Sequence, residues 1–197
     1  RLHERGANVF VPRLPGHGLA DRMSEAHARL DAEALRRATD EAVDVARGLG
    51  DSVVVVGLCV GGTMAAWAAQ ERADVARAVV IAPLQGLARA RGPLTPPAAR
   101  LLLAIPNVFV WWDGKAKQDL AGPKHVYPRF STRSVAQTLV LAAAVEAGAR
   151  RARPAAGSIS VVTVGSDAAV GDGAVARLVR AWRRQGAGPI LLPGKVD

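Results

Sequence analysis

The chain has 197 residues, of which half are hydrophobic and 4% aromatic, and its formal net charge is +9. This size and composition fit one globular domain and exclude a disordered chain, and no apolar run approaches the roughly 18 residues of a membrane-spanning helix. The arginines are scattered along predicted helices without a zinc-ligand spacing or an aromatic-basic strip, so the charge indicates a solvated basic surface rather than nucleic-acid binding.

The first part of the chain alternates short β-branched runs with segments of helical periodicity. The loop Pro12–Gly18 is rich in turn-forming residues and separates the first strand from the first helix. The predicted elements are, in order, the strand Asn8–Val11, the helix Asp31–Gly48, the strand Ser52–Val56, the helix Val60–Arg72 and the strand Ala78–Ala82. Short connections between them predict successive βα units with parallel strand pairing.

Residues 83–154 differ from this alternation because they are rich in proline, with helical stretches near Ala98–Ala104 and Ser134–Arg151. We interpret them as a cap or lid insertion. The alternation then resumes with a strand at Ile159–Val164, a helix at Ala174–Gln185 and a last strand at Pro189–Leu192. The prediction is a single α/β domain over residues 1–197, with an open, mostly parallel sheet in a core of residues 1–82 and 155–197.

The strongest chemical signal is Val53-Val-Val-Val-Gly-Leu-Cys-Val-Gly-Gly62, in which a buried strand runs into a tight turn and a helix of small residues. This pattern is typical of a nucleophile elbow, a strained strand-to-helix turn that presents one reactive side chain. Gly57 and Gly61 are expected to remove side chains that would collide beside it. We expect Cys59 to end a central parallel strand and to face a cleft.

Cys59 stands where such turns usually have serine, and a thiol needs less activation because its ordinary pKa is about 8.5. The helix amino terminus favours the thiolate, and the backbone N–H of Val60 can donate to an oxyanion. The alternative is a buried structural cysteine. A single cysteine cannot form an internal disulfide, which fits a reducing, cytoplasmic compartment.

With these residues the chain resembles the α/β-hydrolase superfamily, in particular its esterase and lipase-like members with a cap. The segment Asn8–Gly18, which ends in Pro-Gly-His-Gly, is similar to the strand and loop before the elbow in such hydrolases. The resemblance implies that Asp167, after the strand Ile159–Val164, orients a catalytic histidine in the same cleft. Asp172 is the alternative acid and Asp113 a weaker one; an exposed turn aspartate or helix cap is the competing interpretation.

The histidine of the implied order of nucleophile, acid and base is missing from the sequence. We expect His17 to shape its loop, His3 and His27 to lie on the surface, and His125 to lie in the cap. Both chain ends resemble interrupted elements, so we expect a fragment truncated at both ends, with the histidine beyond the carboxyl terminus. Such a fragment is expected to be inactive by itself.

The resemblance implies a carboxylester hydrolase with a Cys-His-Asp mechanism, whose partner is a small-molecule acyl ester or thioester. The aromatic residues of the proposed cap could line an acyl pocket, although packing within the cap explains them equally well. No metal-ligand or dinucleotide motif is present, so no cofactor is expected. Two alternatives are an acyltransferase similar to polyhydroxyalkanoate synthases and a non-catalytic binding protein of the same fold.

Overall fold

The computed structural model describes residues 2–87, 95–115, 126–164 and 172–194. Its helices are η1 (His3–Arg5), η2 (Ala26–Arg29), α1 (Ala32–Arg47), α2 (Val60–Glu71), α3 (Thr95–Ala104), α4 (Thr132–Arg151) and α5 (Asp172–Arg184). Its strands are β1 (Val53–Leu58), β2 (Val75–Ile81), β3 (Phe109–Trp111), β4 (Arg129–Ser131), β5 (Ser158–Val164) and β6 (Ile190–Gly194).

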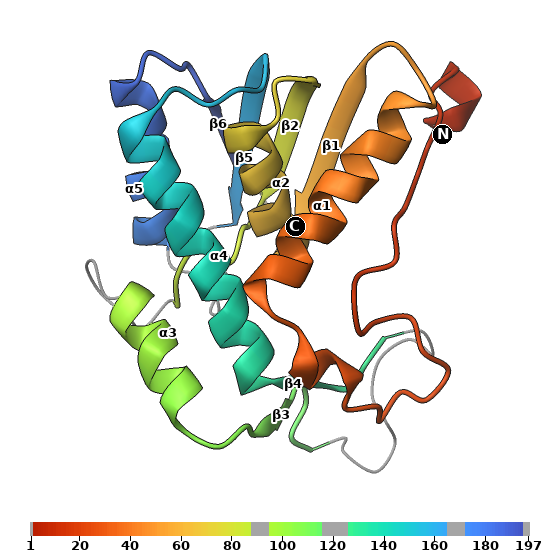
Figure 1. Cartoon of the computed structure of the whole chain (residues 1–197), viewed down its shortest axis with the longest axis vertical. Helices are drawn as coiled ribbons and strands as arrows, with labels where there is room; N and C mark the ends of the chain where they lie inside the picture. The colour runs from red at the N-terminus through yellow and green to blue at the C-terminus, as the bar shows by residue number, and fades with distance from the viewer. Residues whose placement is uncertain (1, 88–94, 116–125, 165–171, 195–197) are drawn as a thin grey trace.

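The core is a parallel sheet, as the βα alternation predicts, and its strand order is β1-β2-β5-β6 (Figure 1). Val55 pairs with Ala78, Val80 pairs with Val161, and the register between β1 and β2 shifts once, between Val53 and Val54. β3 and β4 form a separate antiparallel pair that the sequence did not predict. These three-residue strands are too short for a period-two pattern to stand out.

Helices α1, α2 and α4 form a layer over one face of this sheet (Figure 1). α2 lies directly on β1 and β2, because Ala65, Ala66, Ala68 and Ala69 are buried and let the backbones approach closely. α4 packs beside α2 and buries Leu139 and Val145 in the same hydrophobic core. The predicted cap segment 83–154 therefore includes a helix that packs on the core, and the boundary between core and cap stays a prediction.

The predicted strand Asn8–Val11 is wrong, since residues 7–14 belong to no helix or strand in the structure. The side chain of Asn8 donates to the carbonyl of Leu49, whereas Val9 and Val11 are 55% and 84% exposed. β-branched composition favours a strand only where a neighbouring strand supplies backbone partners. None of the described strands pairs with this segment.

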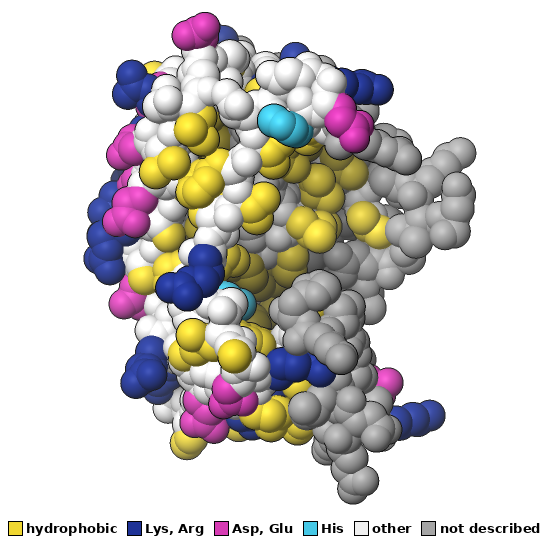
Figure 2. Space-filling view, turned by 90° about the vertical axis from the view of Figure 1, so that its right-hand side faces the viewer, with side chains coloured by type: hydrophobic (Ala, Val, Ile, Leu, Met, Phe, Trp, Pro, Cys, Tyr) yellow, Lys and Arg dark blue, Asp and Glu magenta, His cyan; other side chains and the backbone are white. Residues whose placement is uncertain are grey.

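For the same reason β1 lies at an edge of the described sheet, and the prediction of a central strand before Cys59 is wrong. β1 alternates in burial: Val53 and Gly57 are buried toward the helices, whereas Val54, Val56 and Leu58 are 55%, 60% and 64% exposed. Figure 2 shows the side of the molecule that is on the right in Figure 1, where hydrophobic side chains gather in a hollowed surface.

Candidate active site

The turn between β1 and α2 holds Cys59 in a backbone conformation that residues other than glycine rarely adopt, with φ 55° and ψ −113°. Strain of this kind costs about 1–3 kcal/mol and persists only where the surroundings enforce it. Here the N–H of Cys59 donates to Ile81 O at 3.1 Å, and its carbonyl accepts from the N–H groups of Thr63 and Leu84 at 3.1 and 3.2 Å. The predicted elbow is therefore present and is tied to the end of β2.

The glycines around Cys59 have different roles. A Cβ on Gly57 would lie 1.9 Å from the carbonyl oxygen of Gly61, and a Cβ on Gly62 would lie 2.6 Å from that of Ile81. A Cβ on Gly61 meets no described atom within 4 Å. The expectation of steric crowding is thus confirmed for Gly57 and wrong for Gly61. The backbone carbonyl of Gly61 lies close to Gly57 on β1, whereas no described atom lies near the position of a Cβ on Gly61 itself.

Cys59 and Val60 line a cavity of about 640 Å³, so the nucleophile candidate faces a cleft as predicted. Val60 is the first residue of α2, and the first four N–H groups of a helix lack partners within the helix. The cavity is walled mainly by apolar side chains. Its apolar lining includes Leu30, Leu84, Leu87, Trp112, Val126, Phe130 and Val135.

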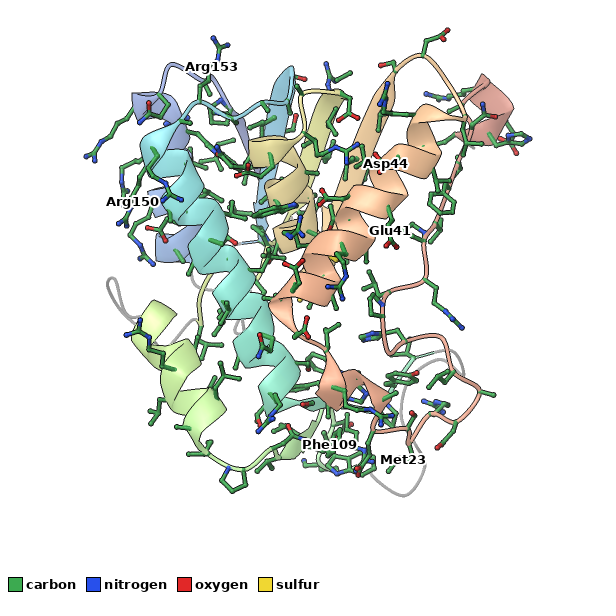
Figure 3. All side chains as sticks on the ribbon, in the orientation of Figure 1. Met23, Glu41, Asp44, Phe109, Arg150 and Arg153 are labelled. Carbon is green, nitrogen blue, oxygen red and sulfur yellow. The ribbon has the colours of Figure 1, made fainter. Side chains whose placement is uncertain are left out.

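The wall opposite the elbow joins the loop after residue 13 to the segment around β4. Tyr127 Oη accepts from the Leu19 N–H at 3.1 Å and donates to Gly16 O at 3.4 Å. Arg129 Nη2 donates to Met23 O at 2.7 Å, and its guanidinium lies 4.1 Å from the centre of the Phe109 ring. Figure 3 labels Met23 and Phe109 at this lower end of the molecule.

The histidines divide between these surroundings. His17 Nδ1 lies 2.9 Å from Pro15 O, so this residue shapes its loop as predicted, and His3 is exposed. His27 was predicted on the surface and is instead 2% exposed on the cavity wall. Its sequence surroundings are polar, and only the contacts of its ring with His17, Tyr127 and Phe109 explain the burial. His125 lies outside the described residues.

Burial lowers the pKa of His27 below its ordinary value of 6.5, and the nearby His17 and Arg129 lower it further. His27 is therefore neutral at pH 7, with one ring nitrogen as donor and the other as acceptor. Both nitrogens are buried and make no hydrogen bond of ordinary geometry with the described residues, although the Ser24 backbone lies near enough to the ring to oppose part of the lowering of the pKa. Sequence reasoning gave no signal for this site.

Of the three acidic candidates, the structure describes Asp113 and Asp172. Asp167 lies outside the described residues, so its role stays a prediction. Asp172 begins α5. Asp113 is exposed and accepts from the Lys115 N–H at 2.8 Å within its own turn, which fits the competing interpretation of a turn aspartate.

Among the described helices, none is long and apolar enough to cross a membrane. In the described part of the chain, no group of three or more His, Cys, Asp and Glu side chains is arranged to hold a metal ion.

Comparison with known proteins identifies the family. The model of the alpha/beta hydrolase family matches residues 1–195, and the chain belongs to this family. A search of curated proteins found no match. The family assignment agrees with the elbow and the parallel sheet described above.

Solved structures show the same fold. One, of the metagenome-derived lipolytic enzymes LipS and LipT, has a TM-score of 0.70 at 19% identity and covers 98% of this chain and 74% of its own. A soluble variant of monoglyceride lipase from Saccharomyces cerevisiae has a TM-score of 0.63 at 14% identity, with 92% and 67% covered. The monoacylglycerol lipase of Paleococcus ferrophilus has a TM-score of 0.58 at 14% identity, with 84% and 66% covered. This chain therefore spans about two thirds to three quarters of these structures.

Proposed function

We propose that this chain carries the acyl-transfer centre of a carboxylic ester or thioester hydrolase, with Cys59 as the nucleophile. The observation behind this proposal is the strained elbow at Cys59, which opens onto a largely apolar cavity. Strained backbone at a reactive side chain in a cleft is a feature of functional sites, and a structural cysteine needs neither the strain nor the cavity. Lipolytic enzymes among the similar structures agree with this choice of substrate.

The first half-reaction forms a bond between Cys59 Sγ and the acyl carbon. The amino terminus of α2 favours the thiolate, which attacks the carbonyl carbon and moves one electron pair onto its oxygen. The N–H of Val60 donates to this oxyanion. When the tetrahedral intermediate collapses, the bond to the alcohol or thiol breaks, and the leaving group takes up a proton as the acyl-enzyme thioester remains.

The second half-reaction returns the enzyme to its starting state. Water attacks the thioester carbon, loses a proton to a histidine, and the carboxylic acid leaves as the Cys59 thiolate re-forms. Asp167 is proposed to orient that histidine. We assign the role to none of the four histidines of this sequence, because His17 is engaged in its loop and His27 is buried in an aromatic cluster.

The proposal has a kinetic consequence for the 197-residue chain. Activated aryl esters need no acid to expel their leaving group, so acylation of Cys59 proceeds, whereas hydrolysis of the thioester lacks a base worth about 10²–10⁴-fold in rate. We expect a burst of at most one aryl alcohol per chain, followed by slow turnover.

The test is a stopped-flow assay with a short-chain p-nitrophenyl ester. Wild type should give the burst, Cys59→Ala should abolish it, and Val140→Ala, which changes an exposed residue of α4, should retain it. An unchanged burst in Cys59→Ala would overturn the proposal. Rapid full turnover by the chain would overturn the inference that hydrolysis of the acyl-enzyme needs a histidine other than the four of this sequence. Adding a short alcohol separates the acyltransferase alternative, because transfer would yield the new ester instead of the acid.

A further inference from the structure

We infer that the carboxyl-terminal ends of α4 and α5 form a docking surface for an acidic segment of a partner protein. This surface is separate from the cavity at Cys59 and does not depend on the proposed function. It consists of exposed arginines at the end of α4, in the turn that follows it, and on the last turns of α5, and we call it the arginine surface. Its members are Arg150, Arg151, Arg153, Arg180, Arg183 and Arg184.

The fold brings together two groups of arginines that are separate in the sequence. Gln185, just after α5, donates from Nε2 to the carbonyl of Arg150 at 2.8 Å. Further back along both helices, the Glu146 carboxylate of α4 accepts from Arg150 and lies 3.6 Å from Nε of Arg177 on α5. The two helices therefore lie side by side and end at the same place. Figure 3 shows Arg150 and Arg153 on this side of the molecule, away from Phe109.

The positive charge of the arginine surface is only partly balanced by carboxylates. Glu146 is shared by Arg150 and Arg177, and the only other described acid beside α4 here is Glu71, whose Oε1 lies 3.2 Å from the position of a Cβ on Gly148. The other members make no ion pair with the described residues; they are Arg151, Arg153, Arg180, Arg183 and Arg184. The two helix ends add about half a negative charge each, which offsets little of this surplus.

The ends of α1 and α2 show the opposite arrangement. Arg72, which follows α2, pairs with Asp44 of α1 and lies 2.7 Å from Asp74. Arg47, the last residue of α1, lies 3.4 Å from the same Asp74 carboxylate. Arginines at these helix ends are neutralised within the chain. The unbalanced charge at the ends of α4 and α5 is therefore a local feature, and not a general property of the helix ends of this arginine-rich chain.

The arginine surface lies at the edge of the sheet opposite to Cys59. Cys59 follows the carboxyl end of β1, whereas α4 and α5 end shortly before the amino ends of β5 and β6. Because these strands are parallel, the two edges are separated by the length of a strand, about 20 Å. None of the members of the arginine surface is among the described residues that line the cavity. A partner bound here would leave the cavity open.

The chemistry of this surface favours carboxylates on a polypeptide. A guanidinium can bind a carboxylate through two parallel N–H groups, and Arg150 and Arg177 already hold the Glu146 carboxylate between them. Sites for single-stranded nucleic acid add aromatic side chains on which bases stack, but Trp182, the aromatic residue of α5, is 0% exposed. A bilayer bound at this surface would leave Cys59 at the far edge of the sheet, away from the lipid.

The first experiment measures binding of a fluorescein-labelled peptide in which glutamate alternates with serine, by fluorescence anisotropy. The wild-type chain should bind this peptide. The affinity should fall as salt is raised from about 0.05 to 0.3 M, because charges exposed to solvent are screened. A peptide with glutamine in place of each glutamate should not bind. Absence of binding of the glutamate peptide at low salt would overturn the inference.

Variants separate the arginine surface from the net charge of the chain. Arg153→Glu combined with Arg180→Glu should weaken binding about 10-fold or more, since each reversal removes an attraction and adds a repulsion. The matched control is Arg29→Glu combined with Arg133→Glu, which changes the net charge equally at exposed residues outside the surface. This control should keep the affinity within about 2-fold, because its charges lie more than a Debye length away.

Two further results would overturn the inference. An equal loss of affinity in both double variants would show that net charge, and not the arginine surface, attracts the peptide. Tighter binding of single-stranded DNA of matched charge, or of phosphatidylserine vesicles, would assign the surface to a different partner. If the double reversal does not fold, Arg153→Gln with Arg180→Gln removes the two charges without adding repulsion, and it should still bind less tightly than the control.

Discussion

Cys59 lies between two regions that are built in different ways. The elbow side consists of β1, α2 and the end of β2, and the backbone hydrogen bonds of Cys59 reach at most 25 positions along the sequence, from Cys59 to Leu84. The opposite wall is held by hydrogen bonds that span 104–108 positions, such as that between Leu19 and Tyr127. The elbow is fixed by close backbone packing, whereas the wall is held by long-range polar contacts and by the ring contacts around His27.

This difference suggests a division of labour. A nucleophile needs a fixed position, and packed backbones that leave no space for a Cβ provide it. A wall held by separate long-range contacts can open locally at low cost, which suits the entry of a substrate chain. The predictions below break one region or the other.

The largest effect is expected at Gly57. Gly57→Ala places a Cβ 1.9 Å from the Gly61 oxygen, so it should lower the free energy of unfolding by about 4 kcal/mol or more. Gly61→Ala is the matched control, since nothing described lies within 4 Å of its Cβ and alanine favours a helix by about 1 kcal/mol over glycine. Urea denaturation measures both. Equal midpoints for the two variants would contradict the packing account of the elbow.

Leu139 tests whether α4 belongs to the closely packed core on the elbow side. Leu139 is 0% exposed against the core, so Leu139→Ala should lower the free energy of unfolding by about 3 kcal/mol. Its neighbour Val140 is 37% exposed, and Val140→Ala should change that free energy by about 0.5 kcal/mol or less. A loss below about 1 kcal/mol for Leu139→Ala would place α4 with a detachable cap.

Tyr127 tests the wall. Tyr127→Phe keeps the ring that stacks on His17, with 5.5 Å between centres, and removes the hydroxyl that joins Leu19 and Gly16. We expect a loss of about 1 kcal/mol in the free energy of unfolding. The amide hydrogen of Leu19 should exchange faster, whereas that of Cys59 should not change. Unaltered exchange at Leu19 would show that the wall is held by other contacts.

The smallest effect concerns pH. Burial keeps the pKa of folded His27 below its ordinary value of 6.5, so acidification protonates the unfolded chain first and lowers stability as the pH falls below 6.5. The pKa of Asp74 is lowered by its hydrogen bond from Arg72, and its contribution is lost only as the pH falls below 3.8, the ordinary value.

Urea denaturation between about pH 7.5 and pH 5.5 therefore isolates the histidines. Wild type should lose more stability over this window than His27→Phe. An identical loss in both proteins would contradict the buried, neutral state of His27.

The elbow side and the opposite wall also differ in how far they could be predicted from the sequence. The elbow was readable because its strand, turn and small-residue helix are contiguous, and the same holds for α1 and α5. The strand at Asn8–Val11 was predicted wrongly, because its partners are a matter of tertiary structure and not of composition. The reason for Gly61 was also wrong, since only the backbone geometry shows which glycine meets which atom.

The wall could not be predicted for a physical reason. His27 is buried by rings from residues 17, 109 and 127, and nothing in the local sequence links these positions. The aromatic residues of the proposed cap could line an acyl pocket or pack within the cap, and the structure shows both: Trp112, Tyr127 and Phe130 line the cavity, whereas Phe109 packs against His27 and Arg129, and Trp111 is not among the lining residues. The position of Arg129 on the wall could not be predicted either, because it follows from its contacts with Met23 and Phe109.

The most direct test of the central claim is mass spectrometry after brief exposure to a p-nitrophenyl acyl ester. The account predicts one acyl group per chain, located on Cys59 by peptide mapping, removed by neutral hydroxylamine as a thioester is, and formed faster in the folded protein than in urea. Acylation of another residue in the folded protein, or a rate on Cys59 no greater than in the unfolded chain, would contradict it.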